Sequence, residues 1–285
     1  MDVLILVNNK YLILIEDKIG TSEHGNQIDR YIESLTDLEK KNTKKIKDTL
    51  GLLPEKKYII PVYFKMINQS YYDSQRYLPI IRKDVLQILN GYKFASMTLL
   101  EMFKENILNI QNESTNYLEI DSSKWEFNHC SGLYSDLKPH INTNNGFGYG
   151  PVNNHNGTFT GCWWYFLNED TLKKIGITSN AIKKIYLQIE RNSKKEFQLA
   201  IKMEYIPSEI GSNILSFEND IMMIDRYFNN SMKFNKKNRT NLLPTNKKGG
   251  RWVTLFKCPL NLNDFELTIQ TCKEAEELLD SFKNT

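Results

Sequence analysis

Long hydrophobic runs are missing from this sequence of 285 residues. Its longest apolar stretches, 11–15 and 58–64, have the length of β-strands, whereas a membrane-spanning helix needs about 20 apolar residues. Asp2 stands where a signal peptide carries basic residues, and no small-residue cleavage site follows it. We therefore expect a cytoplasmic protein without a transmembrane helix.

Cysteine and histidine are scarce, and the charge is nearly balanced. The four cysteines show no Cys-x-x-Cys spacing, so we expect reduced thiols and no disulfide framework. No zinc pattern fits the group His129, Cys130, His140, His155 and Cys162. The net charge of +3 is too small to indicate a nucleic-acid partner by itself.

The pattern of apolar residues and turn formers predicts two lobes. In residues 1–118 we expect a hairpin of strands 2–8 and 11–17, a helix over 26–50, a strand over 58–65, and helices over 83–89 and 95–110. In residues 119–285 we expect loop and irregular sheet over 122–161, a hairpin over 185–203, a helix over 213–228, a strand over 252–258 and a helix over 264–282. The expected class is α/β (α+β overall).

Three charged residues, Asp2, Glu16 and Lys18, stand in or beside strands that are otherwise almost wholly apolar. Glu16 and Lys18 project to one face of their strand, roughly 7 Å apart. A three-residue loop at 8–10 pairs Asp2 with Glu16 on that face, whereas a two-residue loop pairs Asp2 with Ile15 and removes the site. Strand-end charges with one salt bridge are the ordinary alternative.

Two carboxylates beside a lysine suit Mg²⁺ or Mn²⁺, which take oxygen ligands and often share them with substrate phosphates. With Lys18, such a cation would stabilise the charge that develops during phosphodiester hydrolysis. Gln27 and Tyr31 lie four residues apart on the next expected helix, and hence on one face of it.

Together these residues resemble the PD-(D/E)XK nuclease superfamily, in particular its RecB-like bacterial branch. The family pattern is an Asp that opens one core strand (Asp2), a Glu-x-Lys in the next (Glu16-Asp17-Lys18), and a Gln-x-x-x-Tyr on the following helix (Gln27 to Tyr31). The resemblance is sharp over 2–35 and looser over 58–89. Segments 157–164 and 186–190 also resemble uncharacterised bacterial members.

The resemblance implies a mixed central sheet of the restriction-endonuclease type with flanking helices. It makes Asp2 and Glu16 metal ligands, with the Asp17 carbonyl as a third, Lys18 the catalytic lysine, and Gln27 and Tyr31 the helix motif. Family members usually have a helix and a strand before the first Asp, whereas only Met1 precedes Asp2 here. We therefore expect an N-terminally truncated member that is weakened or inactive as written.

The expected function is metal-dependent hydrolysis of DNA, or of RNA, with the second lobe serving the substrate or a partner. The alternatives are a degenerate nuclease fold that binds nucleic acid or protein without cutting it, and an aromatic second lobe that binds carbohydrate or protein. A homodimer or a protein partner could use the exposed sheet of the first lobe.

Two further segments admit two interpretations each. The aromatic residues 163–166 could stack on bases, but such a run is more often core, and we expect core. The basic residues between 233 and 251 could follow a phosphate backbone or could form a solvated loop.

Overall fold

The computed structural model of the chain describes residues 3–17, 26–37, 44, 47–49, 51, 55–68, 77–91, 99–144, 146–154, 157–192, 194–211, 214–228, 235–236 and 251–284. The chain divides into two compact units, Met1–Glu113 and Ser114–Thr285. Each unit has its own sheet and its own apolar core, and each is described by itself below.

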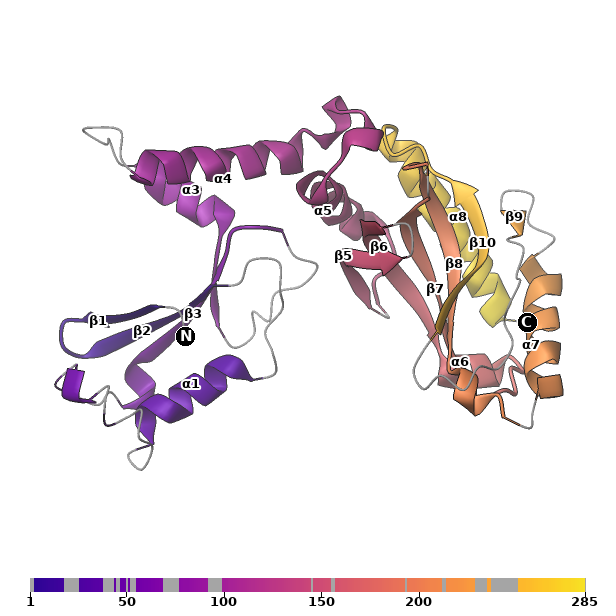
Figure 1. Cartoon of the computed structure of the whole chain (residues 1–285), viewed down its shortest axis with the longest axis horizontal. Helices are drawn as coiled ribbons and strands as arrows, with labels where there is room; N and C mark the ends of the chain where they lie inside the picture. The colour runs from indigo at the N-terminus through magenta and orange to yellow at the C-terminus, as the bar shows by residue number, and fades with distance from the viewer. Residues whose placement is uncertain are drawn as a thin grey trace. The chain divides into compact units, whose positions relative to one another are not determined.

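Unit 1 is built on a four-stranded sheet in the order β1-β2-β3-β4 (Figure 1). The strands are β1 (Val3–Val7), β2 (Tyr11–Asp17), β3 (Ile59–Lys65) and β4 (Leu78–Ile81). β1 is antiparallel to β2, whereas β2, β3 and β4 run parallel. The helices are α1 (Gln27–Thr36), α3 (Arg82–Asn90) and α4 (Leu99–Thr115), with a short 3₁₀ turn, η1 (Lys56–Tyr58), before β3. The predicted mixed sheet with flanking helices is therefore confirmed.

The first hairpin has the three-residue loop on which the predicted site depends. Asn8 and Asn9 adopt positive φ values of 52° and 50°, which asparagine tolerates better than most residues. The register pairs Val3 with Ile15 and Leu4 with Leu14. Continued by one residue, this register would place Asp2 opposite Glu16, although Asp2 itself lies outside the described residues. β1 is an edge strand with Val3 and Ile5 partly exposed, and association of two copies through this edge stays a prediction.

Helices cover both faces of the unit 1 sheet. Ile28, Ile32 and Leu35 of α1 pack in one core cluster with Leu12 and Leu14 of β2. On the other face, α3 and α4 pack against the residues Phe64, Met66 and Ile80 through Val85, Leu89 and Ile107. The buried Arg82 fixes this second layer by donating to the Met66 carbonyl and to the side chains of Asn68 and Gln111.

Helix α1 is shorter than the sequence predicted. It ends at Thr36, and Asp37 has an extended conformation. The sequence that follows, 39–45, is polar throughout, so no apolar side chain extends the buried stripe. Residues 47–49 are helical, whereas Leu38 and Pro54 lie outside the described residues.

Unit 2 contains a six-stranded antiparallel sheet in the order β5-β6-β7-β8-β10-β9. The strands are β5 (Phe147–Asn154), β6 (Gly157–Asn168), β7 (Ile182–Arg191), β8 (Phe197–Tyr205), β9 (Asn235–Lys236) and β10 (Arg251–Pro259). The helices are α5 (Phe127–Leu137), α6 (Glu169–Lys174), α7 (Ile214–Phe228) and α8 (Phe265–Lys283), joined by the 3₁₀ turns η2 (Tyr117–Glu119), η3 (Ser122–Lys124), η4 (Lys138–His140) and η5 (Pro207–Glu209). The second unit is thus α+β, as predicted.

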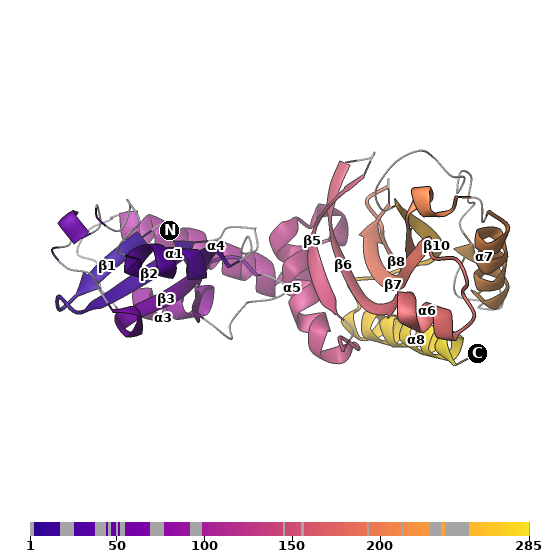
Figure 2. The same ribbon diagram turned by 90° about the horizontal axis from the view of Figure 1, so that it is seen from below.

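Helix α8 runs along one face of this sheet (Figure 2). Trp164 of β6 donates its indole N–H to Glu276 at 2.7 Å, and the Asn142 backbone N–H donates to the same carboxylate oxygen at 2.7 Å. The hydroxyl of Tyr165 donates to Asp280 one turn further along α8. Among the described residues, no helix is long and apolar enough to span a bilayer.

The prediction of loop and irregular sheet over 122–161 was wrong. This range contains the 11-residue helix α5 and the regular hairpin of β5 and β6. Residues 129–134 of α5 are all buried, polar and apolar alike, so burial does not follow the apolar residues and the amphipathic period is weak. A Cβ on Gly132 would lie 2.0 Å from the Ser114 carbonyl oxygen, which shows how closely α5 packs.

Candidate active site in unit 1

Glu16 is the buried acidic residue of the unit 1 sheet. It lies near the end of β2, and only 1% of its surface is exposed. Because side chains alternate along a strand, Glu16 shares a face with Leu12 and Leu14, on which α1 packs. The apolar β2 strand thus holds one carboxylate beside the helix that follows it.

Gln27 joins Glu16 to Tyr31. Its side-chain N–H group donates to Glu16 Oε1 at 2.8 Å and to the Tyr31 hydroxyl at 2.7 Å. Gln27 is the first residue of α1, and Tyr31 lies one turn later on the same face. The N-terminal end of a helix also favours a nearby negative charge. The structure therefore brings together Glu16, Gln27 and Tyr31, the part of the predicted constellation that it describes.

The other predicted site residues have different outcomes. Asp2 and Lys18 lie outside the described residues, so their roles stay predictions. Asp17 is exposed, and its side chain points to the face opposite Glu16. Its side chain therefore does not join this group, and the role of its carbonyl as a metal ligand stays a prediction.

Lys65 is a further charged residue on the same face of the sheet. Glu16 pairs with Tyr63 of β3, and Lys65 follows two residues later. The Lys65 side chain is only 1% exposed, and its ammonium lies 5.7 Å from the centre of the Tyr63 ring. The signal in the sequence is the lysine that ends the predicted buried strand 58–65.

The residues around Glu16 are candidates to hold a divalent cation. Within the described ranges, no group of three or more His, Cys, Asp or Glu side chains is placed to hold a metal ion. Mg²⁺ is usually bound by one or two carboxylates together with water and substrate phosphates. The buried Glu16 carboxylate, held by Gln27, therefore fits such a cation in donor type.

Comparison with known families decides what this constellation resembles. Residues 1–119 match the PD-(D/E)XK nuclease superfamily. The nuclease superfamily match includes β2 with Glu16 and α1 with Gln27 and Tyr31. Unit 2 lies almost entirely outside the matched range. No curated protein and no solved structure matches the chain.

The cysteine and histidine group of unit 2 has structural roles where it is described. His129 accepts a hydrogen bond from the Glu126 backbone N–H at the start of α5. Burial raises the pKa of the Cys130 thiol to about 12, and Cys162 is fully buried. His155 and the residues 237–250 of the basic segment lie outside the described residues.

Proposed function

We propose that this protein is a metal-dependent nuclease that hydrolyses phosphodiester bonds of DNA at the end of β2 and the start of α1. The observation that carries the proposal is the pair of hydrogen bonds from Gln27 to Glu16 and Tyr31. An ordinary polar helix face would not need a carboxylate that is 1% exposed inside an apolar strand. The superfamily match over the same residues supports this interpretation.

Each residue has a defined task in this proposal. Glu16, Asp2 and the Asp17 carbonyl would hold Mg²⁺ or Mn²⁺, which supplies Lewis acidity toward a phosphate oxygen. Gln27 fixes the orientation of the Glu16 carboxylate, and Tyr31 fixes Gln27. Lys18 would stabilise the negative charge that develops on the phosphate oxygens.

The test compares Glu16→Gln and Lys18→Ala with Glu33→Gln, a matched control because Glu33 is an exposed carboxylate on the same unit. We expect Mg²⁺-dependent cleavage of plasmid and linear DNA to fall at least about 100-fold in both site variants, because charge stabilisation at a reaction centre contributes on that order. Glu33→Gln should cleave at the wild-type rate, and Asp17→Ala should be milder than Glu16→Gln.

Two results would contradict the proposal. One is a folded Lys18→Ala protein that cleaves at the wild-type rate, and the other is cleavage that persists in excess chelator. A wild-type protein that binds DNA without cutting it, with or without an N-terminal extension, would instead favour the degenerate, binding-only alternative. Parallel assays on single-stranded RNA would identify the preferred nucleic acid.

A further inference from the structure

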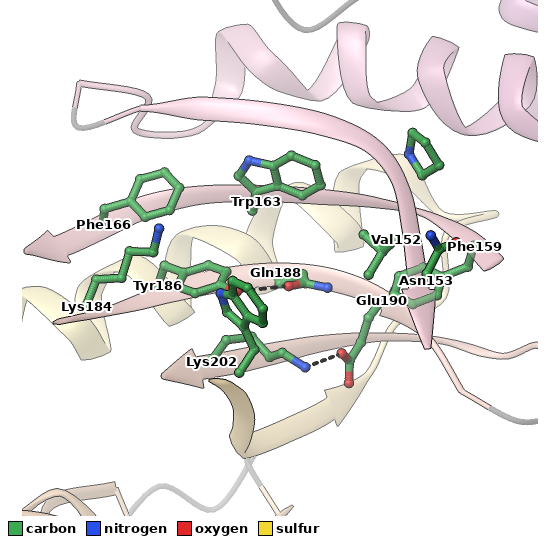
Figure 3. A pocket seen from close by; sticks show the side chains of 12 residues that line it. Val152, Asn153, Phe159, Trp163, Phe166, Lys184, Tyr186, Gln188, Glu190 and Lys202 are labelled. Carbon is green, nitrogen blue, oxygen red and sulfur yellow. Dashed lines mark hydrogen bonds and ion pairs between the residues drawn. The ribbon is translucent and has the colours of Figure 1, made fainter. Parts of the chain in front are cut away.

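A cavity of about 570 Å³ lies on the sheet of unit 2 (Figure 3). Its walls come from five strands, β5, β6, β7, β8 and β10, and include Trp163, Phe166, Tyr186, Gln188, Lys202 and Trp252. Small-molecule pockets typically measure about 300–1,000 Å³, so the space is adequate for one small organic group. Neither the superfamily match nor the candidate active site includes this cavity.

A bulge in β6 determines which aromatic residues reach the cavity. The register of β6 with β7 shifts between Trp164 and Leu167, and Tyr165 has a positive φ of 56°. Trp164 and its neighbour Tyr165 therefore both turn toward α8, where they are bonded to Glu276 and Asp280. Trp163 and Phe166 line the cavity instead. The prediction that 163–166 is core thus holds for its two middle residues.

Small residues flank the centre of the cavity. The ladder across the sheet runs from Gly148 through Trp163 and Gln188 to Ala200. A Cβ on Gly148 would lie 2.5 Å from Trp163 Nε1, so the indole lies directly over this glycine. Gly148 thus makes room for the ring of Trp163, which lines the cavity beside Gln188.

The charges of the cavity are compensated by one another. Lys202 and Glu190 form an ion pair at 2.7 Å, with side chains only 13% and 11% exposed. Glu190 also accepts a hydrogen bond from Gln198 at 2.6 Å, and Lys202 donates to Thr254 at 2.8 Å. Because these charged groups already pair with one another, the cavity suits a neutral ligand better than a phosphate or a carboxylate. A saccharide would need polar groups with free capacity for several hydroxyls.

Gln188 is a polar side chain of the cavity with hydrogen-bonding capacity left. It is 5% exposed and lines the cavity beside Tyr186 (Figure 3). Its carbonyl oxygen accepts from the Tyr186 hydroxyl at 3.4 Å, whereas its N–H group has no acceptor among the described residues. A ligand in the cavity that carries a hydrogen-bond acceptor could accept from this N–H group.

We infer that this cavity binds an unpaired nucleobase, which stacks on the aromatic walls and accepts a hydrogen bond from Gln188. Every base offers a planar face and at least one hydrogen-bond acceptor, and base stacking on aromatic side chains is the common means of holding single strands. Phe166 and Tyr186 stack on each other at 5.3 Å with an angle of 30° between their planes, and the Lys184 ammonium lies 5.5 and 5.7 Å from their ring centres. The rings left for a base to stack on are therefore those of Trp163 and Trp252, which also line the cavity. The inference rests on the proposed function only for the choice of a nucleic acid as the ligand.

The experiment measures binding of a fluorescein-labelled oligodeoxythymidylate of about ten nucleotides, within the usual footprint of single-strand binding proteins. The full-length chain is used in the presence of a chelator, which prevents cleavage. The variants are Trp163→Ala, Gln188→Leu and Trp252→Ala, the last at a residue that is 59% exposed and therefore safe for folding. Leu215→Ala, at a 75% exposed position of α7 outside the cavity, is the matched control.

We expect each cavity variant to bind about tenfold more weakly or worse, since one stacked base contributes on the order of 1–3 kcal/mol. An abasic oligomer of the same length should lose binding to a similar degree, and Leu215→Ala should bind like the wild type. Competition by free deoxynucleosides would identify a nucleotide ligand, whereas competition by oligomers alone would identify a strand.

Three results would overturn the inference: equal binding of the abasic oligomer, unchanged binding by all the cavity variants, or displacement of the oligomer by oligosaccharides and not by nucleosides. Glu16→Gln separates the two proposals. This variant should abolish cleavage and leave oligomer binding unchanged. A wild-type protein that cleaves DNA but does not bind the oligomer through its bases refutes this inference alone. A wild-type protein that binds the oligomer through its bases but does not cleave DNA refutes the proposed function alone.

Discussion

The carboxylate of Glu276 gives a test of how α8 is held on the sheet of unit 2. One of its oxygens accepts from both Trp164 Nε1 and the Asn142 backbone N–H, at 2.7 Å each. Glu276→Ala removes this acceptor and leaves the buried Trp164 indole N–H and the part-buried Asn142 backbone N–H without their partner. An orphaned buried donor costs about 1–3 kcal/mol, so we expect a loss of about 1–3 kcal/mol in the free energy of unfolding from the Trp164 donor, with a smaller addition from Asn142.

The conservative variant Glu276→Gln keeps an oxygen that can accept from both donors, and it should be far less damaging than Glu276→Ala. Its stability should also depend less on pH. Burial raises the pKa of Glu276, and the nearby Asp280 adds to this effect. A carboxyl with a raised pKa binds its proton more tightly when folded, so its contribution is largest below the unfolded pKa and is lost as the pH rises through the folded pKa.

Urea unfolding of the wild type and both variants, followed by tryptophan fluorescence at several values between pH 4 and pH 8, measures these effects. The free energy of unfolding of the wild type should fall relative to that of Glu276→Gln as the pH rises above about 4.3, the ordinary pKa of a glutamate side chain. Melting temperatures should fall by roughly 2–4 °C per kcal/mol for a unit of this size. A Glu276→Ala protein within about 0.5 kcal/mol of the wild type would refute the reasoning, because such a value is typical of surface positions.

Three further predictions concern smaller features. Gln27→Ala should lower DNA cleavage by about tenfold or more and leave the fold intact by circular dichroism, because it frees the orientation of Glu16; an unchanged rate would exclude a positioning role. Asn9→Val should lower the free energy of unfolding by about 1–2 kcal/mol in urea, because Asn9 has a positive φ of 50°, while Asn9→Gly should not. Cys162 and Cys272 should resist a thiol reagent at pH 8 until urea unfolds the protein, because burial raises the pKa of both thiols; fast labelling of the native protein would contradict their placement.

Local patterns were sufficient to predict most of the elements. The apolar strand 11–17, the turn at 8–10 and the amphipathic start of α1 are encoded by neighbouring residues. The sequence left two loop lengths open, and the structure has the three-residue loop that pairs Leu4 with Leu14. The resemblance to the nuclease motif, with the four-residue spacing of Gln27 and Tyr31, predicted the group of Glu16, Gln27 and Tyr31 that the hydrogen bonds of Gln27 connect.

The features that the sequence did not reveal depend on tertiary contacts. Helix α5 buries polar as well as apolar residues over 129–134, so its amphipathic period is hidden. The cavity of unit 2 depends on residues of β5 to β10 that are far apart in the chain, and no short motif marks it. Lys65 is similar, because its burial follows from the packing around β3 and not from its neighbours in sequence.

The bulge at Tyr165 accommodates one extra residue in β6. Because β6 pairs Trp164 with Leu187 and Leu167 with Ile185, Tyr165 and Phe166 together lie opposite the single residue Tyr186. Deleting Tyr165 would remove its bond to Asp280 but would leave Phe166 opposite Tyr186 on the cavity face. A deletion in the regularly paired part of β6 would instead move every side chain beyond it to the other face. A length-scanning library of β6 should therefore tolerate the loss of one residue at the bulge better than elsewhere in the strand.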